Sequence, residues 1–181
     1  MIRNGKSSDI KACVKLHKKN LAEGIFSQLD PNLLEKVYAY AIADKSSFLL
    51  LDFADGKING AALGSEDIST FLKSIRKRYF FPLLANIAWI LFRHPSYLTT
   101  LVQPYAKHAT PELLFLYADA KGRGTGSNLV HASNNEFKKR DIQQYRVELS
   151  SQNKGAFKFY QKQRFQTLKK ADRIIMIKRL L

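Results

Sequence analysis

Apolar positions near the start of the chain recur with the spacing of an amphipathic helix. After a short strand-like opening and a serine at position 7 or 8, these positions are Ile10, Cys13, Val14, His17 and Leu21. Residues three or four apart lie on one face of a helix, so the spacing predicts a helix with one buried face. A second helix is expected from Asp30 and Pro31 to about Asp44, because aspartate caps helices and proline fits their first position.

Two strand-like runs follow and then the pattern changes. Residues 48–53 and 58–64 are joined by the turn sequence Ala-Asp-Gly-Lys, which predicts an antiparallel hairpin. Residues 67–109 are aromatic, basic and interrupted by prolines, which predicts a helical insertion between the third and fourth strands. Its apolar run at 79–92 is too short for a membrane span, which needs about 20 residues.

The second half of the chain alternates strands and helices. The expected elements are a strand at 112–118, a helix at about 124–140, a strand at 145–150, a short helix at 153–163 and a final strand at 173–179. The first of these strands is continuously apolar, which suits a strand buried on both faces. This order, in a chain of 181 residues, predicts one α/β domain (residues 1–181) with a mixed α+β sheet.

The amino-acid composition limits the class of protein to which this chain can belong. The chain is 45% hydrophobic and carries a net charge of +15, which describes a folded protein that attracts polyanions. Cys13 is the single cysteine, so no internal disulfide is expected, and its place on an apolar helix face indicates a buried structural thiol. The N-terminus lacks the apolar stretch of a secretory signal, which predicts a cytoplasmic protein, with a peripheral membrane location as the alternative.

A glycine-rich turn between the strand at 112–118 and the following helix is the main candidate for chemistry. Its residues are Lys121, Gly122, Arg123, Gly124, Thr125, Gly126 and Ser127. Free backbone N–H groups at a helix start, together with glycines and cations, form an anion site, and phosphate fits it. An ordinary glycine-rich turn is the alternative. The turn matches neither the nucleoside-triphosphate P-loop nor the dinucleotide fingerprint.

The same turn resembles the Gln/Arg-x-x-Gly-x-Gly/Ala signature of the GNAT superfamily of N-acetyltransferases, with Lys121 in the first position. Residues 153–165 resemble the second signature of that family, in which Asn, Ala, Phe/Leu-Tyr and a final Gly-Phe recur; Arg164 replaces the usual glycine. Both signatures stand on the expected elements, and such context supports a motif. The resemblance covers 112–165, is weaker before residue 64 and does not extend to 67–109.

The resemblance implies a GNAT-like acyl-CoA N-acyltransferase fold with acetyl-CoA as co-substrate. The strands at 113–118 and 145–150 would splay apart and hold the pantetheine arm, and residues 122–127 would meet the pyrophosphate. Asn153 would contact the pantetheine or cap its helix. The oxyanion donor would be the backbone N–H of Leu116 or Tyr117.

Acetyl transfer to an amine also needs a base and an acid. Tyr160 is the expected acid, because a thiolate of pKa about 8.5 can take a proton from a hydrogen-bonded phenol of pKa about 10; a tyrosine packed in the core is the alternative. Glu112 is the leading base, with Glu148, Asp119 and water as alternatives. No metal is expected, since the histidines lack metal-ligand spacing; they are His17, His94, His108 and His131.

The acceptor is expected to be a primary amine of a small molecule, for which no short signature exists. The insertion resembles basic, apolar inserts of some bacterial acetyltransferases linked to cell-surface glycan synthesis, which suggests an amino sugar on an anionic carrier. Rival interpretations are a GNAT fold without turnover and a basic module that binds nucleic acid or membrane, although no nucleic-acid motif is present. The apolar run at 79–92 would pack on the sheet, form a homodimer contact or cap the acceptor site.

Overall fold

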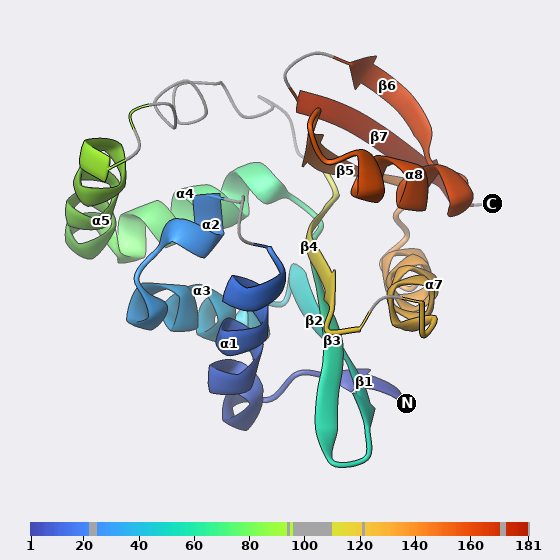
Figure 1. The fold of residues 1–181 in the computed structure, drawn as a ribbon, viewed down its shortest axis with the longest axis horizontal. Coiled ribbons are helices and arrows are strands. Elements are labelled where there is room, and N and C mark those ends of the chain that lie inside the picture. The colour runs from blue at the N-terminus through green and yellow to red at the C-terminus, as the bar shows by residue number, and fades with distance from the viewer. Residues whose placement is uncertain (22–24, 94, 96–109, 121, 171–172, 181) are drawn as a thin grey trace.

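The computed structural model describes residues 1–21, 25–93, 95, 110–120, 122–170 and 173–180. Within these residues, one mixed sheet has the strand order β1-β2-β3-β4-β5-β7-β6 (Figure 1). Its strands are β1 (Ile2–Asn4), β2 (Ser47–Ala54), β3 (Lys57–Ser65), β4 (Glu112–Ala118), β5 (Gln144–Ser150), β6 (Gln166–Lys170) and β7 (Arg173–Arg179). All neighbouring pairs are antiparallel except β4 and β5, which are parallel.

The helices lie in two groups on either side of the sheet (Figure 1). The helices described are α1 (Ile10–Asn20), α2 (Ile25–Gln28), α3 (Pro31–Ala43), α4 (Ile68–Arg78), α5 (Phe80–Arg93), α7 (Thr125–Lys138) and α8 (Lys154–Lys162). The 3-10 turn η1 (Ser7–Asp9) leads into α1. The side chain of Asp30 accepts a hydrogen bond from the N–H of Asn32 at 2.8 Å and caps α3 as expected.

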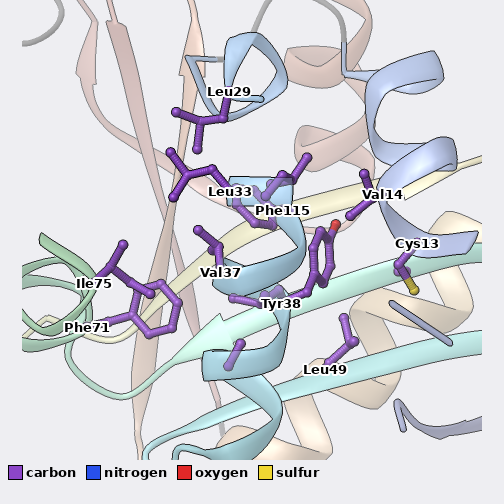
Figure 2. Packing of buried hydrophobic residues seen from close by; sticks show 14 of the residues in the cluster. Cys13, Val14, Leu29, Leu33, Val37, Tyr38, Leu49, Phe71, Ile75 and Phe115 are labelled. Atoms are coloured by element: carbon purple, nitrogen blue, oxygen red, sulfur yellow. The ribbon is translucent and has the colours of Figure 1, made fainter. Parts of the chain in front are cut away.

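Each face of the sheet has its own apolar core. On one face, α1, α3 and α4 cover a cluster that includes Leu34, Tyr38 and Phe71. The ring centroids of Tyr38 and of Phe115 from β4 lie 6.1 Å apart, and Figure 2 shows these two side chains within the cluster. On the other face, α7 and α8 cover a second cluster around Leu129 and Met176. The strand β4 contributes to both clusters, as expected for a strand buried on both faces.

A chain of polar groups crosses the first core. The ring of His17 lies 2.8 Å from the hydroxyl of Tyr38, which donates to the hydroxyl of Tyr117, and that hydroxyl donates to the carbonyl of Cys13. Burial lowers the pKa of His17 to about 4 and raises the pKa of the Cys13 thiol to about 12. His17 is therefore a neutral packed side chain, and Cys13 is the buried structural thiol that the sequence predicted.

The expected order of elements is confirmed, except that the strand β6 and the short helix α2 were not predicted. The hairpin is β2 and β3, the capped second helix is α3, and the two strand–helix units after residue 110 are β4–α7 and β5–α8. The sequence did not predict β6, because Gln-Thr-Leu-Lys-Lys is polar and Leu168 is 66% exposed at the sheet edge. The segment 67–109 contains α4 and α5; its residues 94 and 96–109 lie outside the described part. Among the described helices, none is long and apolar enough to cross a bilayer.

Candidate cofactor and catalytic site

The two parallel strands in the middle of the sheet separate soon after they meet. The register joins β4 to β5 only at Glu112 and Arg146, where the N–H of Arg146 donates to the carbonyl of Pro111 at 3.0 Å. Beyond this pair β5 continues along β7, whereas β4 continues along β3 (Figure 1). Beyond this pair, the backbone N–H and C=O groups that β4 and β5 direct toward each other form no hydrogen bonds between the two strands. They are therefore available to bind a ligand.

The ladder between β3 and β4 decides which groups of β4 face this gap. The N–H of Asp119 donates to the carbonyl of Asn59 at 2.7 Å, and bonding alternates along an antiparallel ladder, so Tyr117 also directs its N–H and C=O to β3. Leu116 and Ala118 direct theirs toward β5. Of the two expected oxyanion donors, Leu116 has its N–H on the open side and Tyr117 does not.

The turn before α7 has the backbone of an anion site. Gly122 and Gly124 have φ angles of 82° and 78°, a left-handed conformation that side chains disfavour. The N–H of Asn128 donates to the carbonyl of Gly124, and among the described residues the N–H groups of Thr125, Gly126 and Ser127 have no partner. Three donors therefore point out of the helix start. Arg123 is exposed, and the expected contribution of Lys121 falls outside the described residues.

Close packing fixes the position of this helix start. A Cβ atom on Gly60 of β3 would lie 2.7 Å from Cγ2 of Thr125, so α7 approaches the sheet closely at that point. A Cβ atom on Gly126 would lie 3.2 Å from two ring atoms of Phe159 in α8. The side chain of Gln163 also donates to the hydroxyl of Ser127 at 2.9 Å. The beginning of α7 is thus held against both the sheet and α8.

Helix α8 brings the predicted acid to the same region. Asn153 caps it by accepting a hydrogen bond from the N–H of Ala156 at 2.9 Å, which is the capping alternative. Tyr160 is 8% exposed and packs against Phe159 and Phe165, with ring centroids 5.2 and 5.0 Å away. Burial raises the pKa of Tyr160, so its hydroxyl is protonated at neutral pH and is a weaker acid than an exposed phenol. That hydroxyl has no hydrogen-bond partner within the described chain.

The three candidate bases all form ion pairs. Glu112 is 6% exposed and accepts a hydrogen bond from Nε of Arg146 at 2.7 Å. Glu148 pairs with Arg173 at 2.7 Å, and the exposed Asp119 pairs with Lys19 at 2.6 Å.

Their electrostatics separate the candidates. Burial raises the pKa of Glu112 to about 7, with the charge and hydrogen bond of Arg146 acting in the opposite direction. The hydrogen bond from Lys19 lowers the pKa of Asp119. A carboxylate that titrates near neutral pH is well suited to accept and release protons, which favours Glu112.

Nothing else among the described residues offers an alternative active site. Within the described residues, no group of three or more His, Cys, Asp or Glu side chains could hold a metal ion. His131 is exposed on α7, and His94 and His108 lie outside the described part. A cleft of about 550 Å³ lies between α3 and α5, with Lys36 and Trp89 among its lining residues. Its lining includes none of the residues expected at the site.

Residues 105–174 match the model of a family described as the acetyltransferase (GNAT) domain. These residues carry a GNAT acetyltransferase domain, whose class of activity is acetyl-CoA-dependent N-acetyl transfer. The match includes β4, α7, β5 and α8, which form the candidate site. No curated protein sequence matches the chain.

Solved structures show the same fold across the whole chain. An N-acetyltransferase from Staphylococcus aureus Mu50 is 15% identical, with a TM-score of 0.67 over 100% of this chain and 98% of that one. The PaiA N-acetyltransferase from Thermoplasma acidophilum, in complex with coenzyme A, is 16% identical, with a TM-score of 0.66 over 99% and 98%. A ribosomal-protein-alanine N-acetyltransferase from Brucella melitensis is 14% identical, with a TM-score of 0.66 over 99% of both chains.

The partners of the predicted site residues were not predicted from the sequence. Arg146 stands two positions before Glu148 on β5, and this period-two spacing puts both on one face of the strand. That spacing is a signal that could have placed Arg146 near a carboxylate. Arg173, Phe159 and Gln163 act across elements, and no local pattern indicates their contacts with Glu148, Gly126 and Ser127.

Proposed function

We propose that this GNAT protein transfers the acetyl group of acetyl-CoA to a primary amine by direct attack in a ternary complex. The observation that carries the proposal is the open seam between β4 and β5. The two strands pair only at Glu112 and Arg146, and the seam beyond this pair lies beside the free backbone N–H groups at the start of α7. Extended ligands bind along unpaired strand edges, and phosphates bind at helix N-termini.

The cofactor residues follow from this arrangement. The pantetheine arm pairs with the free backbone groups of Leu116 and Ala118, as an added strand would. The pyrophosphate accepts hydrogen bonds from the N–H groups of Thr125, Gly126 and Ser127. The positive φ of Gly122 and Gly124 shapes the turn, and Arg123 and Lys121 contribute charge.

The chemical step assigns one task to each group. The amine nitrogen bonds to the acetyl carbonyl carbon while the N–H of Leu116 stabilises the developing oxyanion, and the carbon–sulfur bond then breaks. Tyr160 gives its proton to the departing thiolate, and Glu112 takes a proton from the amine, directly or through water. Solvent restores both protonation states. Glu148, Asp119 and water remain the alternative bases.

The acceptor we propose is a small-molecule amine, with an amino sugar on an anionic carrier as the first candidate. The net charge of +15 supports an anionic acceptor, because a field of one sign concentrates ligands of the opposite sign. The name of the Brucella enzyme, a ribosomal-protein-alanine N-acetyltransferase, supports an alanine amine of a protein as a second class of acceptor.

Calorimetry and thiol release test the proposal. Acetyl-CoA should bind in the micromolar range, about −8 kcal/mol, and raise the melting temperature. An acceptor panel of amino sugars, polyamines and alanine-terminated peptides should show release of the coenzyme A thiol with at least one class. Absence of acetyl-CoA binding contradicts the site, and binding without turnover of any amine supports a GNAT fold that does not catalyse.

A further inference from the structure

Helix α5 is apolar on the side that faces solvent. The exposed fractions are 50% for Phe80, 80% for Phe81, 54% for Leu84, 55% for Trp89 and 81% for Phe92. Trp89 stacks on Phe92, with ring centroids 6.2 Å apart, so two of these side chains form one continuous surface. Large aromatic side chains gathered in this way mark a surface that another molecule covers.

The inner side of α5 is anchored, which fixes the direction of the outer side. Ile90 is 3% exposed within the first apolar core, and Leu83 packs against that core. Figure 1 shows α5 (green) at the edge of the molecule, on the side of α4 away from β5–β7. With 14 residues the helix is about 21 Å long, shorter than the ~30 Å hydrocarbon core of a bilayer. It can lie in a membrane surface but cannot cross one.

Cations border this apolar surface. Arg76, Lys77 and Arg78 occupy the last turn of α4, directly before α5, and Arg93 ends α5 with its guanidinium 4.9 Å from the ring of Trp89. Arg76, Lys77 and Arg78 are exposed and, within the described part of the chain, form no ion pair. The sequence contains no Asp or Glu from residue 68 to residue 111.

We propose that α5 and the last turn of α4 dock the protein on an anionic lipid bilayer. The outer aromatic side chains of α5 enter the boundary between headgroups and acyl chains, and the cations beside them meet the lipid phosphates. A second copy of this chain fits the surface less well. Symmetric contact through α5 would bring two basic clusters together, and like charges across an interface cost free energy.

Trp89 provides a direct reporter, because it is the one tryptophan in the sequence. With vesicles of mixed phosphatidylglycerol and phosphatidylcholine, we expect co-sedimentation and a blue shift of Trp89 emission, with quenching by brominated acyl chains. Both signals should weaken as salt rises and be small with phosphatidylcholine alone. None of these measurements involves acetyl-CoA, so the inference stands or falls separately from the proposed function.

Two sets of substitutions separate the apolar and charged contributions. Phe81→Ser with Phe92→Ser changes side chains that are about four-fifths exposed, so the fold should persist while vesicle partitioning falls at least tenfold. Arg76→Gln, Lys77→Gln and Arg78→Gln together should reduce partitioning roughly a hundredfold, about fivefold for each cation. The matched control, Lys11→Gln with Lys15→Gln and Lys57→Gln, removes three exposed charges elsewhere and should have a much smaller effect.

Three results would overturn the proposal. The first is wild-type protein that does not sediment with anionic vesicles, or that binds phosphatidylcholine equally well. The second is an unchanged partition coefficient in the folded Phe81→Ser, Phe92→Ser variant. The third is a loss of vesicle binding in the control variant (Lys11, Lys15 and Lys57) that is as large as the loss in the triple variant of the last turn of α4. A wild-type dimer that these two serine substitutions convert to a monomer, without vesicle binding, assigns the surface to a second copy and is also contrary to the proposal.

Discussion

The carboxylate of Glu112 accepts a hydrogen bond from Nε of Arg146 at 2.7 Å, at the residue pair where β4 and β5 meet before they separate. One side chain from each strand therefore holds the apex of the seam in which we place acetyl-CoA. The same contact sets the acidity of the candidate base, because Arg146 opposes the effect of burial on its pKa.

The pH dependence of turnover tests Glu112 as the base. A base acts in its deprotonated form, so kcat/KM should rise with pH through an inflection near the Glu112 pKa of about 7. Glu112→Gln should remove this inflection and shift the pH optimum upward, because the reaction then depends on amine deprotonated by solvent. Arg146→Met should move the inflection upward, and Arg173→Met should move it less. An unchanged profile in Glu112→Gln would assign the base to Glu148, Asp119 or water.

The stability of the protein should also depend on the protonation of Glu112. Its pKa in the folded protein, about 7, exceeds the ordinary value of 4.5. Proton binding by Glu112 therefore adds to the free energy of unfolding. This contribution is fully present below pH 4.5 and is lost as pH rises through 7. Urea unfolding between pH 5 and pH 8 should show a loss of up to about 3 kcal/mol in the wild type relative to Glu112→Gln. Parallel stability curves for the two proteins would contradict the raised pKa.

A matched pair of tyrosines tests the acid. Tyr160→Phe should leave acetyl-CoA affinity unchanged and lower kcat by about a hundredfold, the usual effect of one positioned acid. Tyr145 lies in the same apolar cluster, but its hydroxyl donates to the side chain of Asn134 at 2.8 Å. Tyr145→Phe should therefore affect stability more than kcat. Equal rates in Tyr160→Phe and wild type would leave Tyr160 as a packed core residue.

Much of the fold was predictable because its signals are local. The Asp30 cap, the Ala-Asp-Gly-Lys turn and the spacing of apolar positions in α1 each lie within one element, and the structure confirms all three. The strand β6 has no such pattern, since it is a polar edge strand that depends on pairing with β7.

The details of the site depend on pairing between distant segments. Which of Leu116 and Tyr117 faces the seam follows from the register with β3, which shifts between Leu63 and Gly64 where β4 carries the extra residue Leu114. A shift of one residue reverses the direction of every backbone group along a strand, so composition and propensity cannot decide it. The partners of Glu112, Glu148 and Asp119 were also unpredictable as a set, because each cation comes from a different element.

The structure gives the glycines of the turn different roles, and this difference can be measured. No atom lies within 4 Å of a Cβ placed on Gly124, so Gly124→Ala should act through its φ of 78° and weaken acetyl-CoA binding by distorting the turn. A Cβ on Gly126 would instead lie 3.2 Å from the ring of Phe159. Relief of this close contact would push α7 and α8 apart. Gly126→Ala should therefore lower the melting temperature as well as acetyl-CoA affinity.

The double variant Gly126→Ala, Phe159→Leu decides between the two explanations for Gly126. If packing against Phe159 is what requires glycine, the smaller leucine should restore the melting temperature and most of the affinity, a coupling of about 1 kcal/mol in a double-mutant cycle. If glycine is required so that the pyrophosphate can approach the backbone, the melting temperature should recover while the affinity measured by calorimetry stays low. Phe159→Leu alone provides the reference for the loss of aromatic packing. If the effects of Gly126→Ala and Phe159→Leu on the melting temperature and on acetyl-CoA affinity are additive, the contact between Gly126 and Phe159 is not the cause of the losses.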